Sequence, residues 1–191
     1  MPDIAFVGLG RMGTPMCAAL VRAGYMVTAT DKRAEREPAA IACGASWQDT
    51  PARAASSADV LITMLPGPRE VRTAMLGKDG ALTSLAAAAA WIDMTSNSPA
   101  AVRPVREQAM KQGVEILEAP AGGGIAAARE GTLQLFVGGE AVADLPRDRP
   151  GPLRLPVRQL GTSPGQRPSA RASWALFIDE RPLMLRRRAS E

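Results

Sequence analysis

The sequence predicts an α/β fold built on a doubly wound, mostly parallel sheet. Short apolar runs such as Ile4–Val7, Asp59–Leu65 and Trp91–Met94 have the length and composition of strands that are buried on both faces. Helical patterns separate these runs, and strands that alternate with helices indicate parallel pairing. The length of 191 residues fits one domain, or one domain with an additional segment.

The first strand is followed at once by a glycine pattern, Gly8-x-Gly10-x-x-Gly13. Gly8 permits a tight turn from strand to helix, Gly10 has no Cβ to block a pyrophosphate, and Gly13 allows the helix to pack closely on the strand. The helix also offers free N–H groups to phosphate at its N-terminus. The pattern therefore predicts a dinucleotide site, whose candidate residues are Gly8, Leu9, Gly10, Arg11, Met12 and Gly13.

The second expected strand, Tyr25–Thr30, is followed by Asp31, about 20 residues beyond the glycines. A carboxylate at this place can hold the ribose hydroxyls of NAD and repels the 2′-phosphate of NADP. Lys32 and Arg33 come next and could accept that phosphate, so NAD is the favoured cofactor and NADP stays the alternative. A purely structural interpretation is that Asp31 only caps the following helix.

The middle of the sequence continues the alternation. Ala39–Cys43 predicts a helical turn that ends at Gly44, and Ala45–Trp47 predicts a brief third strand. Thr50 is a suitable N-cap for a helix with Pro51 at its first position. The strand at Asp59–Leu65 and a helix at Arg69–Leu76 follow.

The later elements are also separated by glycine, proline and polar residues. They are, in order, an Ala-rich helix at Leu82–Ala90, the strand at Trp91–Met94, a helix from Pro99 to Gly113, a strand at Val114–Leu117, a glycine-rich loop at Ala119–Gly124, a short helix at Ile125–Glu130 and a final strand at Leu133–Val137.

The composition changes after residue 140. Prolines recur from Pro146 to Pro182 at intervals too short for long helices, and arginine is frequent while lysine is absent. We therefore expect a dinucleotide-binding domain at residues 1–140 and an irregular, basic, Pro/Arg-rich tail at residues 141–191. Within that tail, only Ala172–Ile178 could form an ordered turn or strand.

Several classes of site are excluded by composition. The chain has no histidine, which removes histidine acid–base chemistry and histidine metal ligands. Cys17 and Cys43 are too few for a disulfide scaffold or a structural zinc site, so we expect no metal and two buried free thiols in a reducing cytosol. No apolar run reaches the roughly 18 residues of a membrane span, and no secretory signal is evident, so the expected location is cytoplasmic.

The positive charge lies in the tail. Residues 1–140 carry about 13 Lys and Arg against about 14 Asp and Glu, whereas residues 141–191 carry about 10 Arg against about 5 acidic residues. A basic tail can bind nucleic acid or an acidic membrane surface. This tail lacks interleaved aromatic residues and an amphipathic period, so neither partner is expected.

Four stretches together resemble a known family. They are Gly8-Leu9-Gly10-Arg11-Met12-Gly13 with Met16; Thr63-Met64-Leu65-Pro66 with Val71 and Met75-Leu76-Gly77; Ile92-Asp93-Met94-Thr95-Ser96 with Pro99; and Glu118–Gly124 with Gly131-Thr132-Leu133 and Val137-Gly138-Gly139. In this order the stretches resemble the N-terminal NAD(P)-binding domain of the β-hydroxyacid dehydrogenase family, of the 3-hydroxyisobutyrate dehydrogenase type. The resemblance covers roughly residues 3–140.

The resemblance implies a Rossmann domain and an oxidoreductase that interconverts a small 3-hydroxyacid and its semialdehyde. Leu65 and Pro66, and likewise Thr95 and Ser96, match family positions that line the nicotinamide-ribose side of the cofactor. Both pairs follow predicted strands, where ligands of open α/β sheets bind. A structural alternative is that Thr95 and Ser96 cap a helix.

The glycine-rich loop departs from the family pattern. That pattern reads Asp-Ala-Pro-Val-Ser-Gly-Gly, and its serine contacts substrate, whereas here Glu118 replaces the aspartate and Gly122 replaces the serine. Backbone N–H groups of Gly122, Gly123 and Gly124 could still bind a substrate carboxylate. The change affects the expected substrate and leaves the expected cofactor unchanged.

The catalytic lysine of the family lies in an all-helical domain, in a Lys-x-x-Asn-Asn pattern. No such pattern occurs here and no lysine follows Lys111, so no catalytic residue is assigned. Arg171 falls roughly where that lysine would come. An arginine stays protonated, so it could stabilise an oxyanion but could not shuttle the hydroxyl proton.

The first functional hypothesis is therefore a dehydrogenase module without its helical domain, with weak cofactor binding, very low turnover and no defined homo-oligomer. The alternatives are a non-catalytic dinucleotide-binding protein and an unstable gene fragment with a basic tail. The family motifs end at the same place where the Pro/Arg-rich composition begins. We therefore add the hypothesis that residues from about 141 onward are frame-shifted or otherwise replaced. Reading the coding DNA in its other frames tests it.

Overall fold

The computed structural model describes residues 2–135, 157–158 and 175–176, and these contain a six-stranded parallel sheet in the order β3-β2-β1-β4-β5-β6. This order is that of a doubly wound dinucleotide-binding sheet, in which the strand order reverses between the parallel neighbours β1 and β4. The predicted fold class is therefore confirmed. The strands are β1 Ile4–Val7, β2 Val27–Thr30, β3 Ser46–Trp47, β4 Val60–Thr63, β5 Ala90–Asp93 and β6 Glu115–Glu118.

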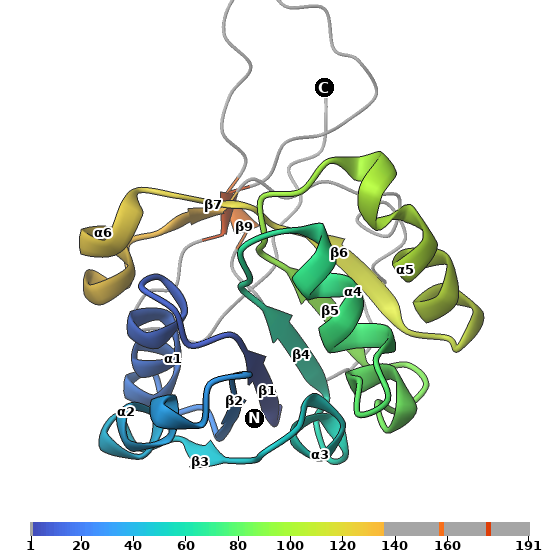
Figure 1. Ribbon diagram of the computed structural model, residues 1–191. Helices are drawn as coiled ribbons and strands as arrows, with labels where there is room; N and C mark the ends of the chain where they lie inside the picture. The colour runs from blue at the N-terminus through green and yellow to red at the C-terminus, as the bar shows by residue number, and fades with distance from the viewer. Residues whose placement is uncertain (1, 136–156, 159–174, 177–191) are drawn as a thin grey trace, which may run out of the picture.

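Helices cover both faces of the sheet (Figure 1). One face packs against α1 Gly13–Arg22, α2 Glu37–Ala42 and α6 Gly124–Glu130, and the other against α3 Pro51–Ala55, α4 Pro68–Leu76 and α5 Pro99–Lys111. Two short 3-10 turns, η1 Ala34–Arg36 and η2 Ala81–Thr83, complete these layers.

The core consists of two apolar clusters, one on each face, because alternate residues of each strand point to opposite sides. Phe6 and Ile92 face α1, whereas Val7 and Trp91 face α4 and α5. Both clusters are built mainly from aliphatic side chains, and the central strands β2, β1, β4 and β5 between them are almost wholly buried. This burial explains why the strand sequences are continuous apolar runs rather than alternating ones.

Most predicted elements are confirmed to within two or three residues, but the predicted helix at Leu82–Ala90 is wrong. The chain forms η2 and then turns, with Ala88 at φ 66, and β5 already begins at Ala90. The alanines favour a helix locally, but Leu85 and Ala89 are buried against the sheet and Ala88 N–H bonds to Gly113 O at 2.9 Å. Tertiary packing therefore overrides helix propensity.

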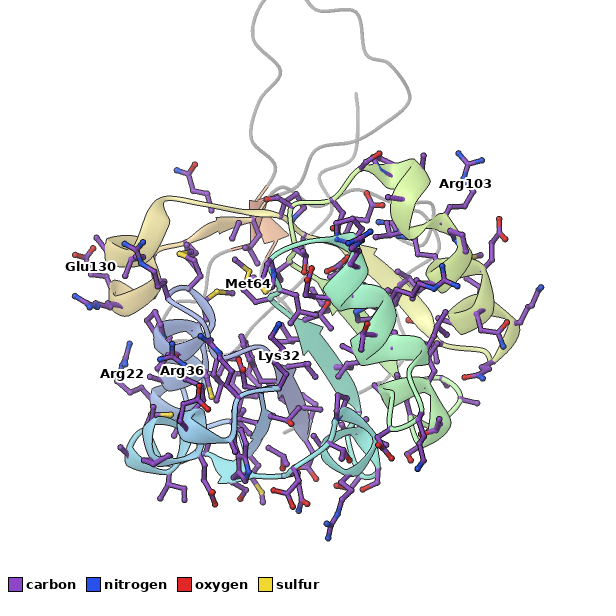
Figure 2. The ribbon with its side chains drawn as sticks, in the orientation of Figure 1. Arg22, Lys32, Arg36, Met64, Arg103 and Glu130 are labelled. Atoms are coloured by element: carbon purple, nitrogen blue, oxygen red, sulfur yellow. The ribbon has the colours of Figure 1, made fainter. Side chains whose placement is uncertain are left out.

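After β6 the chain crosses to the other face of the molecule. The predicted glycine-rich loop contains a short strand, β7 Ala121–Gly122, which pairs antiparallel with β8 Gln134–Leu135. Between them α6 packs beside α1, where Arg22 Nη2 donates to the carbonyl of Arg129 at 2.7 Å (Figures 1 and 2). The predicted final strand is thus confirmed at its start, and its residues 136–137 lie outside the described residues.

Two further strands are described in the segment expected to be irregular. β10 Ala175–Leu176 falls within the one stretch where a turn or strand was expected, whereas its antiparallel partner β9 Val157–Arg158 was not predicted. The remaining tail and the domain boundary at residue 140 lie outside the described residues, and so does Arg171.

The two cysteines are free, with their sulfur atoms 4.0 Å apart between α1 and the end of α2. Cys17 is buried as expected, but Cys43 is only half-buried, which corrects the prediction of two buried thiols. Burial, and secondarily the neighbouring Cys43 thiol, raises the pKa of Cys17.

This raised pKa makes the free energy of unfolding depend on pH in the alkaline range. The protonated Cys17 thiol contributes its full stability below the unfolded thiol pKa of about 8.5, and that contribution falls as pH rises toward the folded pKa, by about 1.4 kcal/mol per pH unit. We expect Cys17→Ala to remove this slope in urea unfolding between about pH 8 and pH 10. Cys43→Ala, which keeps the buried thiol, is the control; equal slopes in wild type and Cys17→Ala would refute this account.

Candidate functional site

The strands end in register at one edge of the sheet. Val7 pairs with Thr30 and with Thr63, Thr63 pairs with Asp93, and Asp93 pairs with Glu118. The loops that follow these residues therefore lie side by side. This edge is where open α/β sheets bind ligands.

The glycine turn after β1 has three distinct local geometries. A Cβ on Gly8, which has φ +105, would lie 2.3 Å from the carbonyl oxygen of Met64, and a Cβ on Gly13 would lie 1.8 Å from the carbonyl oxygen of Gly8. At Gly10, by contrast, a Cβ would meet no described atom within 4 Å. Gly8 and Gly13 are thus required by close backbone packing, whereas Gly10 faces open space.

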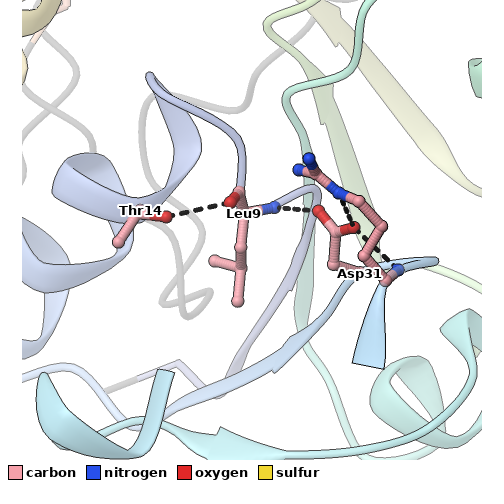
Figure 3. A network of polar contacts seen from close by, with 4 residues as sticks. Leu9, Thr14 and Asp31 are labelled. Carbon is pink, nitrogen blue, oxygen red and sulfur yellow. Dashed lines mark hydrogen bonds and ion pairs between the residues drawn. The ribbon is translucent and has the colours of Figure 1, made fainter. Parts of the chain in front are cut away.

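Asp31 holds this turn from the neighbouring strand (Figure 3). Its Oδ2 accepts a hydrogen bond from Leu9 N–H at 2.7 Å, and its Oδ1 accepts from Arg33 N–H at 3.0 Å. On the other side of the turn, Thr14 Oγ1 donates to Leu9 O at 3.0 Å. Asp31 therefore does more than form a local turn, because it joins the end of β2 to the glycine loop 22 positions earlier.

Two basic residues follow Asp31 and are placed differently. Arg33 Nε lies 3.2 Å from Asp31 Oδ1, and this ion pair covers the carboxylate, whose side chain is 7% exposed against 40% for Arg33. Lys32 is exposed, and in Figure 2 its label lies between α1 and α4. The ion pair reduces the negative charge that a ligand phosphate would meet at Asp31.

The residues predicted for the nicotinamide side are tied together by a hydrogen bond. Thr95 Oγ1 accepts from Leu65 N–H at 3.1 Å, which joins the loops after β4 and β5. Pro66 and Ser96 are exposed at the same edge. The alternative that Thr95 and Ser96 cap a helix is wrong, because the N-cap of α5 is Ser98.

Sequence reasoning missed a buried carboxylate, Asp93, at the centre of this region. Thr63 Oγ1 and Thr95 N–H donate to its Oδ1 at 2.9 and 3.1 Å, and Asn97 Nδ2 donates to its Oδ2 at 2.9 Å. Trp91 Nε1 donates to Thr63 Oγ1 at 3.0 Å and so orients that hydroxyl. An acidic residue at the end of an otherwise apolar strand was the available signal, since buried charges are rare unless they are paired.

A cation from α5 completes this buried cluster. Arg106 forms an ion pair with Glu118 at the end of β6, and its charge also interacts with Asp93. Burial lowers the pKa of Arg106, and the negative charge of Asp93 opposes that shift. Arginine nevertheless stays charged, so Arg106 is a cation beside two acidic residues.

The predicted substrate loop follows Glu118. Gly123 has φ +105 and Gly124 has φ +71, whereas Gly122 is extended within β7. A Cβ on Gly124 would meet no described atom within 4 Å, whereas one on Gly123 would meet Ala127 Cβ at 2.8 Å. Positive φ at both positions favours glycine, because a side chain would be strained in this conformation.

Metal and membrane sites are not found in the part of the chain that the structure describes. There, no group of three or more His, Cys, Asp or Glu side chains is placed to hold a metal ion. Of the helices described, none combines the length and apolar character needed to cross a bilayer.

The sequence matches the family model of the NAD binding domain of 6-phosphogluconate dehydrogenase over residues 3–144. The chain belongs to this family. The match begins just before β1 and includes the glycine turn, Asp31 and the loops with Leu65–Pro66 and Thr95–Ser96.

Similar proteins agree with the resemblance drawn from the motifs. The chain is 40% identical over 141 residues to a 3-hydroxyisobutyrate dehydrogenase of Pseudomonas aeruginosa, covering 74% of this chain and 47% of that protein. It is 37% identical over 150 residues to an NAD-dependent L-serine dehydrogenase of the same organism, covering 78% and 50%. A solved Mycobacterium tuberculosis 3-hydroxyisobutyrate dehydrogenase with L-serine has a TM-score of 0.68 at 38% identity, covering 73% and 47%.

These matches confirm the prediction of an N-terminal NAD(P)-binding Rossmann domain of the 3-hydroxyisobutyrate dehydrogenase type. The chain spans about half the length of the curated relatives that it matches.

Proposed function

We propose that the described domain binds NAD across the carboxyl edge of its sheet, as the cofactor-binding part of a 3-hydroxyacid dehydrogenase. The observation that carries this proposal is the turn at Gly8–Gly13, where Gly10 faces open space and the buried Asp31 carboxylate holds Leu9. The N-terminus of α1 at Gly13 and the absence of a Cβ at Gly10 suit a diphosphate.

The remaining predicted residues fit the two ends of such a ligand. A carboxylate can accept about four hydrogen bonds, and protein donors occupy three of these positions on Asp31, which leaves capacity for a ribose hydroxyl. The loops of Leu65–Pro66 and Thr95–Ser96 would hold the nicotinamide ribose. Bound NAD would supply hydride-transfer chemistry, and these protein groups would orient it.

NAD is the proposed cofactor because Asp31 disfavours a 2′-phosphate. The Arg33 ion pair weakens this selection by neutralising part of the carboxylate charge, so NADP stays a weaker ligand rather than an excluded one. Arg33 thus favours NADP in two ways: its Nε neutralises part of the Asp31 charge, and its terminal nitrogens can contact a phosphate.

Titration calorimetry with both dinucleotides tests this assignment. We expect wild type to bind NAD about tenfold more tightly than NADP, and Arg33→Met to widen that ratio because the Asp31 charge is no longer neutralised. Arg103→Met, which removes an exposed arginine from α5 (Figure 2), is the matched control and should leave the ratio unchanged. Equal affinities for NAD and NADP in wild type would contradict the assignment of NAD.

The proposed substrate is a small 3-hydroxyacid or the matching semialdehyde. Two of the similar proteins are named with L-serine, which is itself a 3-hydroxyacid. Support within this chain comes from the Gly123–Gly124 turn, where no Cβ shields the backbone N–H groups that would bind the substrate carboxylate next to Gly122. A serine hydroxyl is missing at Gly122, so carboxylate binding would rest on backbone groups alone.

A further inference from the structure

Asp93 is a buried carboxylate that lies just before the loop assigned to the nicotinamide side. Its residue is 2% exposed, and all three of its hydrogen-bond partners are donors. Two of these, Thr95 N–H and Asn97 Nδ2, belong to the loop itself. A single side chain therefore fixes the path of that loop as it leaves β5.

Thr95 connects Asp93 to the neighbouring loop, which follows β4 and contains Leu65. With its N–H held by Asp93, Thr95 places its Oγ1 where Leu65 N–H donates to it at 3.1 Å. A threonine hydroxyl also has one hydrogen to donate. No acceptor for that hydrogen occurs among the described residues.

A positive charge from α5 lies near Asp93. Arg106 forms an ion pair with Glu118, which directly precedes the glycine-rich loop, and the negative charge of Asp93 opposes the lowering of the Arg106 pKa by burial. The same cluster thereby connects the loops after β5 and β6. A buried carboxylate that accepts three hydrogen bonds is a rigid element in a low-dielectric interior.

We propose that Asp93 is a positioning residue for the nicotinamide half of the dinucleotide, acting through Thr95 and Leu65 without contacting the ligand. This inference rests on the proposed function, because it assumes that NAD binds at this edge. In this proposal the two carboxylates act on different parts of the ligand. Asp31 binds the adenosine half, and Asp93 positions the loops around the nicotinamide half.

Titration calorimetry with ADP and with NAD distinguishes a change in the adenosine half of the site from a change in the nicotinamide half. ADP carries the adenosine and the diphosphate but lacks the nicotinamide ribose. We expect Asp93→Asn to weaken NAD binding about tenfold and to change ADP binding less than about twofold, since the amide loses the charge that attracts the loop N–H groups. Asp59→Asn is the control, because Asp59 also accepts a backbone N–H, from Asp3 at 2.9 Å, but before β4 at the opposite edge.

A second variant covers the case in which Asp93→Asn does not fold. Thr95→Val keeps the side-chain shape and removes the hydroxyl that accepts from Leu65. It should also weaken NAD and spare ADP, and Thr95→Ser should restore NAD binding.

The outcomes separate the two proposals. If wild type binds neither NAD nor ADP, the proposed function fails. If wild type binds both equally, or if the variants weaken both ligands to the same extent, the dinucleotide site stands and the positioning role of Asp93 is refuted.

Discussion

Gly13→Ala is expected to lower the free energy of unfolding by about 3 kcal/mol, because its new methyl group has no room. The added Cβ would lie 1.8 Å from the carbonyl oxygen of Gly8 and 3.2 Å from the ring of Phe6. The Gly8 oxygen is a backbone atom in the turn between β1 and α1, so it cannot rotate away. Urea unfolding followed by circular dichroism measures the loss.

Gly10→Ala is the matched control for this prediction. No described atom lies within 4 Å of its Cβ position, so we expect the free energy of unfolding to change by less than about 1 kcal/mol. The same methyl group should weaken NAD binding, because it occupies the space assigned to the diphosphate. Equal destabilisation by the two substitutions would contradict the distinct roles given to these glycines.

Asp31→Asn is expected to weaken NAD binding about 30-fold, which corresponds to the loss of a charge-assisted hydrogen bond of about 2 kcal/mol. It should affect NADP much less, because the 2′-phosphate no longer meets a negative charge, so selectivity between the cofactors should disappear. That change in selectivity separates a ligand contact from a structural role, since a damaged turn would weaken both cofactors alike. Calorimetry with NAD and NADP measures it.

Asp49→Asn is the control for Asp31→Asn. Asp49 also pairs with a nearby arginine, Arg53 at 3.8 Å, but its side chain is 75% exposed and lies between β3 and α3. We expect it to leave both affinities unchanged. Retention of NAD selectivity in Asp31→Asn would show that Asp31 only supports the turn.

The sequence predicted the parts of this protein that depend on local chemistry. The glycine turn could be predicted because each glycine has a steric reason, and Asp31 because its distance from the turn is typical of dinucleotide sites. The strands were recognisable because burial on both faces requires continuous apolar residues.

The remaining features depend on tertiary contacts that no local pattern records. The helix predicted at Leu82–Ala90 does not form because Leu85 and Ala89 are held against the sheet. The Arg33 ion pair with Asp31 could not be foreseen, because a basic residue after β2 is as often solvated. Asp93 gave only the weak signal of one acid at a strand end, since its hydrogen bonds to Thr63 on β4 and to the loop of Thr95 and Asn97 form only in the folded protein.

The central claim is that the diphosphate of NAD binds at the glycine turn while Asp31 holds the adenosine ribose. Backbone-amide NMR during a titration with NAD tests it most directly, because each amide reports its own surroundings. The account predicts saturable shifts that are largest at residues 9–13 and at Arg33. Saturable shifts confined to the opposite edge of the sheet, around Asp3 and Asp59, or no shifts at residues 9–13, would contradict it.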